Sequence, residues 1–202
     1  SVIAAIVAVL VVVAAGNKGQ YFGITSPGAA RKALTVGAVD DYDEIAWFSS
    51  RGPTLDYRVK PEIVAPGVDV CSPVPEYLFG ESYQCWSGTS MATPHVAGAA
   101  ALAKQFGRVY FSYDAPPEVL KNVLIVEATD DLGYNVYEQG AGRLNIAKLI
   151  AQSSIFGYGG GWIYPAVINF GLVDKGEEVS AEIFIEEYRQ SRAYSFELEV
   201  LD

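Results

Sequence analysis

The sequence predicts an α/β fold, in which helices flank a mainly parallel sheet, followed by a partial antiparallel β-sandwich. Residues 2–15 form an unbroken apolar run with three consecutive valines at 11–13, as in a parallel strand covered on both faces. An Ala-rich segment with helical spacing begins near residue 90. After a Gly-rich stretch, apolar and polar residues alternate as in antiparallel strands. We therefore predict an α/β domain at 1–152, a linker at 153–162 and the truncated start of a β-sandwich accessory domain at 163–202.

Composition limits the possible functions. The chain has 202 residues, half of them hydrophobic, so it can bury a sizeable core. Its net charge of −10 argues against nucleic-acid binding, which needs a basic face, and fits a soluble, self-repelling protein. The two cysteines and one histidine form no metal-binding cluster, which argues against structural zinc and predicts no metal site. Surplus carboxylates could host a structural Ca²⁺ ion, but charge alone does not locate a site.

The apolar run at residues 2–15 has three interpretations. It is shorter than the roughly 20 residues of a transmembrane helix, so no transmembrane segment is predicted. It could be the core of a signal peptide, but no basic residue precedes it. The polar loop Gly16–Gly19 favours a buried strand over 10–15, because ligand sites of parallel sheets lie at the carboxyl ends of strands. Within that loop, Asn17 is either a site residue or a simple turn residue.

The middle of the chain is predicted from composition and alternation. Residues 19–32 are a loop, and 34–39 the next strand. The carboxylate cluster at 40–44 is interpreted as a solvated loop, with Ca²⁺ binding as the alternative. Residues 68–70 alternate like a half-exposed strand.

Cys71 and Cys85 flank a Tyr-, Phe-, Pro- and Gly-bearing loop or hairpin at 72–84. If the two ends lie side by side, a disulfide could close it and would stabilise the fold by about 3 kcal/mol in the chain-entropy model. Two buried free thiols are the alternative.

Gly88 is expected to make a sharp turn, after which a helix begins at or near Ser90 and ends near Gln105 or Phe106. Pro94 fits the first turn, where backbone N–H groups lack helical partners. A hydroxyl at Ser90 faces free N–H groups and the positive end of the helix dipole, so negative charge beside it would be stabilised. The alternative is that Ser90 only caps the helix.

The remaining elements follow from the same rules. Proline at a helix start followed by helical spacing predicts a helix from 116 to 124. A turn is expected at 129–133. Strands are predicted at 167–171, 179–185 and 194–200; because three strands cannot close a sandwich, this domain is expected to continue past Asp202.

Residues 88–98 read Gly-Thr-Ser-Met-Ala-Thr-Pro-His-Val-Ala-Gly, which resembles the nucleophile segment of the subtilisin-like serine proteases, or subtilases. The resemblance extends over residues 7–150 and matches the second half of a catalytic domain. Further similar segments lie at 11–19, 25–29, 45–53, 60–70 and 139–146. The segment at 139–146 resembles the close of subtilase domains, which implies a last helix at 145–152.

This resemblance implies a serine endopeptidase that hydrolyses polypeptides through an acyl-enzyme. It implies that Ser90 is the nucleophile and that the Asn17 side chain and the Ser90 backbone N–H form the oxyanion hole. The residues expected to line the substrate site are Gly16, Thr25, Gly88 and Thr89.

A nucleophilic serine needs a general base, and this chain does not offer one. Its one histidine, His95, follows Ser90 by five residues on one helix, a rotation of about 140°, so it is expected to be a structural core or cap residue. Subtilases carry Asp, His and Ser in that order. We therefore expect the catalytic Asp and His in a missing amino-terminal portion, and the isolated chain should be close to inactive.

The resemblance also implies a secreted or cell-surface protein, which favours a disulfide between Cys71 and Cys85. Two other functions stay open. The chain could be a catalytically inactive relative that serves as a binding or structural module. It could also be a secreted or signal-anchored α/β protein whose Ser90 merely caps a helix.

Overall fold

The computed structural model describes residues 9–151, 161–164, 180 and 184–187. Most of the predicted linker, the strands expected at 167–171 and 194–200, and the first residues of the apolar run lie outside these described residues.

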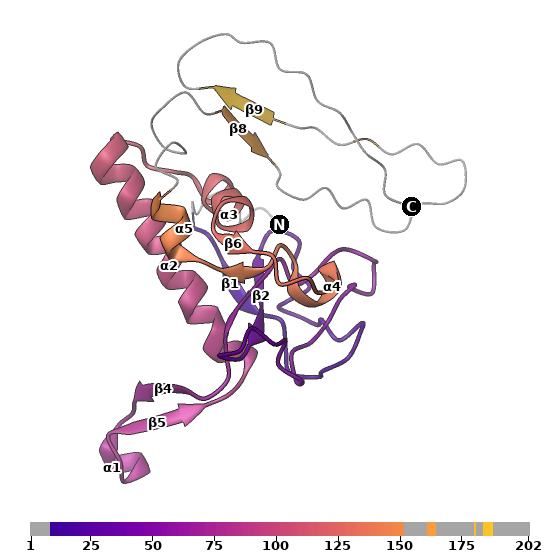
Figure 1. Ribbon diagram of the computed structural model, residues 1–202, viewed down its shortest axis with the longest axis vertical. Helices are drawn as coiled ribbons and strands as arrows, with labels where there is room; N and C mark the ends of the chain where they lie inside the picture. Colours follow the sequence, from indigo (N-terminus) through magenta and orange to yellow (C-terminus); the bar gives the residue numbers. More distant parts are fainter. Residues whose placement is uncertain (1–8, 152–160, 165–179, 181–183, 188–202) are drawn as a thin grey trace.

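The core of the fold is a five-stranded sheet with the order β1-β2-β3-β7-β6 (Figure 1). Its strands are β1 (Val12–Ala14), β2 (Leu34–Val39), β3 (Ile63–Pro66), β7 (Arg143–Leu144) and β6 (Thr129–Asp130). The first four are parallel and β6 is antiparallel to β7, which confirms the predicted α/β class with a mainly parallel sheet. The strand predicted at 34–39 is buried along its whole length, as expected of a central parallel strand.

The long helix α2 (Thr89–Phe111) packs against β1, β2 and β3 (Figure 1). Its small side chains allow close approach to the sheet, and they are fully buried at helical spacing. These residues are Ala92, Val96, Ala99 and Ala103. The other helices beside the sheet are α3 (Pro117–Val126), α4 (Val136–Gln139) and α5 (Ile146–Ala151). Helix α5 begins one residue after Asn145, whose side-chain oxygen accepts a hydrogen bond from the Lys148 N–H and caps the helix.

Helix α2 is longer than the sequence predicted, because it continues past Phe106 to Phe111. Gly107 does not end it, since Phe106 packs against the core and also contacts Tyr110 one turn later. The helix ends at Ser112, whose φ of 53° is left-handed.

Two other boundaries differ from the prediction. The first two residues of the turn expected at 129–133 form β6, because they pair with β7. The strand expected at 68–70 starts at Val70, because Asp69 has a left-handed φ of 50°.

A disulfide-linked hairpin extends away from the sheet (Figure 1). It consists of β4 (Val70–Pro73), the short helix α1 (Glu76–Phe79) and β5 (Tyr83–Trp86). Cys71 and Cys85 lie opposite each other in its antiparallel ladder and are bonded. No residue of α1 is buried, so the tip of the hairpin lies outside the core.

The carboxyl-terminal strands β8 (Gly161–Tyr164) and β9 (Phe184–Glu187) form an antiparallel pair, the pairing type expected for this region. Strand β8 starts inside the stretch assigned to the linker from composition. Within the part of the chain that the structure describes, no helix combines the length and the apolar character needed to cross a bilayer.

Candidate active site

The turn after β1 places Asn17 at the carboxyl end of the sheet. Gly16 has a φ of +105°, which side-chain-bearing residues rarely adopt, and a Cβ there would lie 3.0 Å from Ser50 Oγ. Ser50 fixes the turn from the other side: its N–H donates to the Gly16 carbonyl (2.9 Å), and its Oγ accepts from the Lys18 N–H (3.0 Å). Asn17 itself is exposed, so its amide is accessible to a ligand.

Thr89 ties this turn to the start of α2, 72 residues further along the chain. The Thr89 N–H and Oγ1–H both donate to Asn17 Oδ1, at 3.0 and 2.9 Å. The Gly16 N–H donates in turn to Thr89 Oγ1 (3.1 Å). With its carbonyl oxygen held in this way, the Asn17 amide presents Nδ2, its only donor, in a defined direction.

Two nitrogen atoms that carry N–H groups lie near one place beside Gly88. Asn17 Nδ2 lies 3.2 Å from the position that a Cβ on Gly88 would occupy, and the Ser90 nitrogen lies 3.8 Å from the same point. Within the described residues, no acceptor is found for the Ser90 N–H, which lies in the first turn of α2, where N–H groups have no helical partner. Two N–H groups and a helix N-terminus can stabilise an oxygen that becomes negative there.

The reason for glycine at position 88 differs from the sequence prediction. Its φ of 162° is extended backbone that any residue adopts, so the expected sharp turn is wrong as the explanation. A methyl group there would lie 3.2 Å from Asn17 Nδ2, so the amide would have to shift by a few tenths of an ångström to admit it. Close approach of the two chain segments, rather than backbone conformation, favours glycine at this position.

His95 is exposed, which corrects the expectation of a core histidine. Its Nδ1 donates to the Met91 carbonyl one turn earlier (2.9 Å). This bond holds the imidazole against its own helix, and His95 makes no contact with Ser90 among the described residues.

Thr25 lies on an exposed loop, and no hydrogen bond within residues 9–151 joins it to Asn17, Thr89 or Ser90. Its carbonyl accepts from the Ala29 N–H (3.0 Å), which closes a tight turn. Gly28 in that turn is buried against the end of β1, where an added Cβ would lie 3.0 Å from the Ala14 carbonyl oxygen. The turn at 25–30, here called the pocket loop, is therefore placed beside the strand that leads to Asn17.

Sequence reasoning missed two roles. It assigned Thr89 only to substrate binding, whereas the buried Thr89 orients Asn17. It gave Ser50 no role, although this fully buried hydroxyl holds the Gly16 turn. The sequence feature that could have indicated this role is the pair Ser49-Ser50, which lies within the segment at 45–53 that resembles subtilases.

The carboxylate cluster at 40–44 has other partners. Asp40 Oδ1 accepts from the Tyr42 and Glu44 N–H groups, both at 2.9 Å, and Asp43 pairs with Arg143. Across the described residues there is no group of three or more His, Cys, Asp or Glu side chains that could hold a metal ion.

A protein-family comparison matches residues 3–159 to the subtilase family. Pyrolysin from Pyrococcus furiosus is 38% identical over 179 residues, which cover 69% of this chain and 12% of pyrolysin. The serine protease AprX from Bacillus subtilis is 41% identical over 158 residues, covering 68% of this chain and 34% of AprX. The chain thus spans about a third or less of the length of these relatives.

Solved structures give the same picture at the level of the fold. The prenylagaramide maturation protease PagA matches with a TM-score of 0.60 and 31% identity, covering 71% of this chain and 50% of PagA. The patellamide maturation protease PatA matches with a TM-score of 0.59 and 34% identity, covering 71% of this chain and 51% of PatA.

Proposed function

Because the chain belongs to the subtilase family, we propose that it supplies the nucleophile and the oxyanion-binding groups of a serine endopeptidase. The observation that supports this proposal is the Asn17–Thr89 pair, which holds the Asn17 carbonyl oxygen and leaves Asn17 Nδ2 and the Ser90 nitrogen 3.2 and 3.8 Å from one point beside Gly88. A serine that only capped its helix would not need a distant asparagine held in this orientation.

In the proposed reaction, the carbonyl oxygen of the scissile peptide bond lies between Asn17 Nδ2 and the Ser90 nitrogen. Ser90 Oγ attacks the carbonyl carbon while a base removes its proton, and the resulting negative oxygen is stabilised by the two donors. The proton then passes to the leaving amine, the C–N bond breaks and an acyl-enzyme remains on Ser90. Water hydrolyses this ester in a second, equivalent step, and no cofactor enters either step.

We propose that the general base and the carboxylate that orients it come from a part of the protein outside these 202 residues. The one histidine of the chain is held by the Met91 carbonyl on the helix of Ser90 itself. The chain also spans only about half of the PagA and PatA structures it matches, so each of those proteins has a further half that this chain does not cover. Here, the complete enzyme means this chain together with that portion.

The proposed substrate is a polypeptide. The side chain before the scissile bond would occupy the space between the Gly16 turn and the pocket loop that begins at Thr25. The backbone of Gly88 and Thr89 would bound the site on the side of α2. Gly16 and Gly88 fit this role because each lies where a side chain would obstruct a neighbouring group.

We also propose that the protein is secreted or displayed at the cell surface. The Cys71–Cys85 disulfide supports this, since such bonds persist mainly in oxidising compartments. Among the relatives, Vpr from Bacillus subtilis, 33% identical over 162 residues, is named a minor extracellular protease.

A fluorophosphonate probe tests the proposed function, because it modifies only an activated serine. We expect the complete enzyme to be labelled on Ser90, and the Ser90→Ala variant to stay unlabelled. This chain alone should stay unlabelled and should not cleave casein, because it lacks the base. A complete, folded protein that is neither labelled nor able to cleave casein would instead support the inactive binding module.

A further inference from the structure

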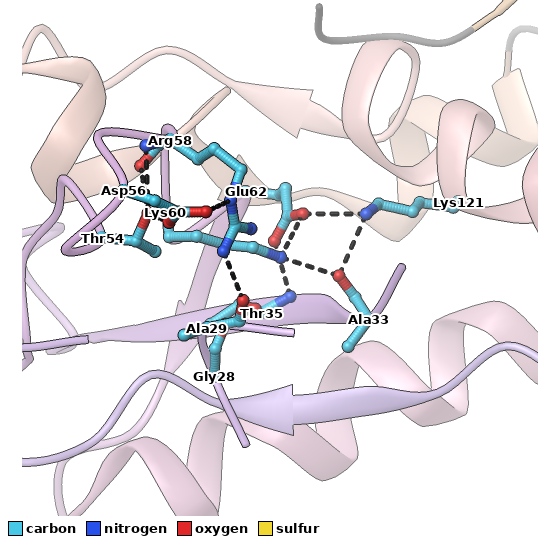
Figure 2. A network of polar contacts seen from close by, with 10 residues as sticks. All are labelled: Gly28, Ala29, Ala33, Thr35, Thr54, Asp56, Arg58, Lys60, Glu62 and Lys121. Atoms are coloured by element: carbon cyan, nitrogen blue, oxygen red, sulfur yellow. Dashed lines mark hydrogen bonds and ion pairs between the residues drawn. The ribbon is translucent and has the colours of Figure 1, made fainter. Parts of the chain in front are cut away.

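Three backbone carbonyls in and just after the pocket loop accept hydrogen bonds from buried side chains of β2 and of the segment before β3. Figure 2 shows these contacts around Gly28, Ala29 and Ala33. None of the donors touches Asn17 or Ser90 among the described residues, so the reaction proposed above does not account for them.

The Gly28 carbonyl is held by Thr35, a fully buried residue of β2. Thr35 Oγ1 donates to Gly28 O at 2.7 Å, and the Thr35 N–H donates to Glu62 Oε2 at 2.7 Å. Glu62 lies just before β3 and is itself buried. The Glu62 carboxylate therefore holds Thr35, and Thr35 in turn holds the pocket loop at Gly28.

Glu62 is held in place by two ammonium groups. Lys60 Nζ donates to Glu62 Oε1 at 2.5 Å, and Lys121 Nζ, which reaches in from α3, donates to the same oxygen at 2.8 Å (Figure 2). Both lysines also donate to the Ala33 carbonyl, at 2.8 and 3.0 Å. Charged hydrogen bonds in a buried place are directional and strong, so Ala33 and Glu62 form one rigid unit with β3 and α3.

The Ala29 carbonyl is held by Arg58, which is 7% exposed. Arg58 Nη2 donates to Ala29 O at 2.7 Å, and its Nε donates to Asp56 Oδ2 at 2.8 Å. Asp56 is oriented by Thr54, whose hydroxyl donates to Asp56 Oδ1 at 2.6 Å. The Arg58 guanidinium is thus held by Asp56 through Nε and holds the pocket loop through Nη2.

We propose that Thr35, Arg58, Lys60, Glu62 and Lys121, here called the loop clamp, are positioning residues that set which side chain the substrate pocket accepts. The proposal rests on the proposed function, because it takes the pocket loop as one wall of that pocket. The clamp holds residues 28, 29 and 33, while residues 25–27 of the loop are exposed to a ligand. When the loop is held by these hydrogen bonds, the pocket keeps its width as a substrate side chain enters. When the loop is free to move, the pocket discriminates less between side chains of different size.

The test compares two peptide substrates that differ only in the residue before the scissile bond, phenylalanine or alanine. In the complete enzyme, Thr35→Val removes the donor to Gly28 at nearly constant volume, and Thr35→Ser is the matched control that keeps it. We expect Thr35→Val to change the ratio of kcat/KM for the two substrates by about three- to tenfold, chiefly through KM, with the ratio unchanged in Thr35→Ser. Titration with the fluorophosphonate probe normalises each rate to the amount of active enzyme.

Arg58→Met is a second variant that loosens the loop through a different contact, and it should shift the same ratio. If Thr35→Val gives no titratable enzyme, the ratio of kcat/KM for the two substrates in Arg58→Met is the result that tests the proposal. If the loop clamp only stabilised the fold, these variants would contain less titratable enzyme, but the ratio of kcat/KM for the two substrates would stay the same. An unchanged ratio in these variants overturns the proposal. Failure of the proposed function looks different, because the unsubstituted enzyme would then neither titrate nor cleave either peptide.

Discussion

At the scale of single residues, Thr89 decides the orientation of Asn17. A side-chain amide can be turned by 180° with little change in shape, and only one of its two orientations offers a donor toward Ser90. The two hydrogen bonds from Thr89 to Asn17 Oδ1 select that orientation. The proposed oxyanion site therefore depends on a residue that would not itself touch the oxygen.

Replacing Asn17 tests the donor directly. In the complete enzyme we expect Asn17→Ala to lower kcat by about 10²–10³ with little change in KM, because the lost bond forms with charge that develops only in the transition state. Asn17→Asp is the matched control for shape: it can still accept from Thr89 but has no N–H to offer. The kcat of Asn17→Asp should fall at least as far as that of Asn17→Ala. A normal kcat in Asn17→Asp would show that the Asn17 N–H takes no part in the mechanism.

Replacing Thr89 tests the orientation. Thr89→Val keeps the volume but loses the hydroxyl that links Gly16 N to Asn17 Oδ1. Since the Thr89 N–H still donates to Asn17, we expect a smaller loss, about tenfold in kcat, with Thr89→Ser close to the unsubstituted enzyme. Steady-state kinetics on a peptide substrate measures both; equal rates for Thr89→Val and Thr89→Ser would contradict the orienting role.

At the scale of elements, the hairpin β4–α1–β5 depends on its disulfide more than the sheet does. Its tip has no buried residue, so burial contributes little to its stability. The Cys71–Cys85 bond closes a short loop, with a sequence separation of 14. Strand β5 leads directly into Gly88 and Ser90, so order in the hairpin bears on the start of α2.

We predict that the Cys71→Ser/Cys85→Ser variant opens the hairpin locally. Loop closure of this length contributes about 3 kcal/mol in the chain-entropy model, which corresponds to about a hundredfold change in the opening equilibrium. Hydrogen exchange should therefore accelerate by about that factor in β4 and β5, while the amides of β2 and β3 exchange as before. Acceleration spread equally over the sheet would show that the bond supports the whole fold instead.

The elements differ in how well the sequence predicted them. The starts of β2, α2 and α3 could be predicted because each depends on its own residues: apolar runs, helical spacing and proline at a helix start. The buried strand predicted over 10–15 is wrong in length and burial, because β1 spans only Val12–Ala14 and is a half-buried edge strand of its sheet. The end of α2 could not, because Phe106 contacts the core and Tyr110 and so carries the helix past Gly107. Strands β6 and β7 have two residues each, too few to show a period, and they exist through pairing with each other.

The site shows the same division. The motif around Ser90 and the loop at Asn17 indicated candidate residues, but the sequence could not show which atoms face each other. Lys60 and Glu62 belong to a segment singled out only for its resemblance to subtilases, and nothing in the sequence indicated that both charged side chains are buried. Their burial depends on Lys121 and Thr35, which lie far away in the chain and meet them only in the fold.

At the scale of the whole molecule, the buried lysine makes stability depend on pH. Burial lowers the pKa of Lys60 from its ordinary value of 10.5 to about 8, although the neighbouring Glu62 acts in the opposite direction. Between pH 8 and 10.5 the unfolded chain therefore binds this proton more tightly than the folded chain, and the free energy of unfolding should rise with pH in this window.

Urea unfolding at several pH values measures this effect. We expect the Lys60 contribution to increase the free energy of unfolding by up to about 3 kcal/mol across the window, and Lys60→Met to lose that rise. Other groups titrate in both the unsubstituted protein and Lys60→Met. The effect of Lys60 is therefore the difference between their two curves of unfolding free energy against pH. Parallel curves would show that Lys60 keeps an ordinary pKa in the folded protein.

The disulfide in the hairpin has a consequence for cleavage of the chain by a protease. Tyr77 and Leu78 are exposed at the tip, where the backbone is open to such a cut. The piece with Asn17 and the piece with Ser90 would still be linked by the bond between Cys71 and Cys85, outside the cut. A nicked molecule would thus run as one band until a reductant separates it, and a cut at this exposed corner would leave the two fragments joined.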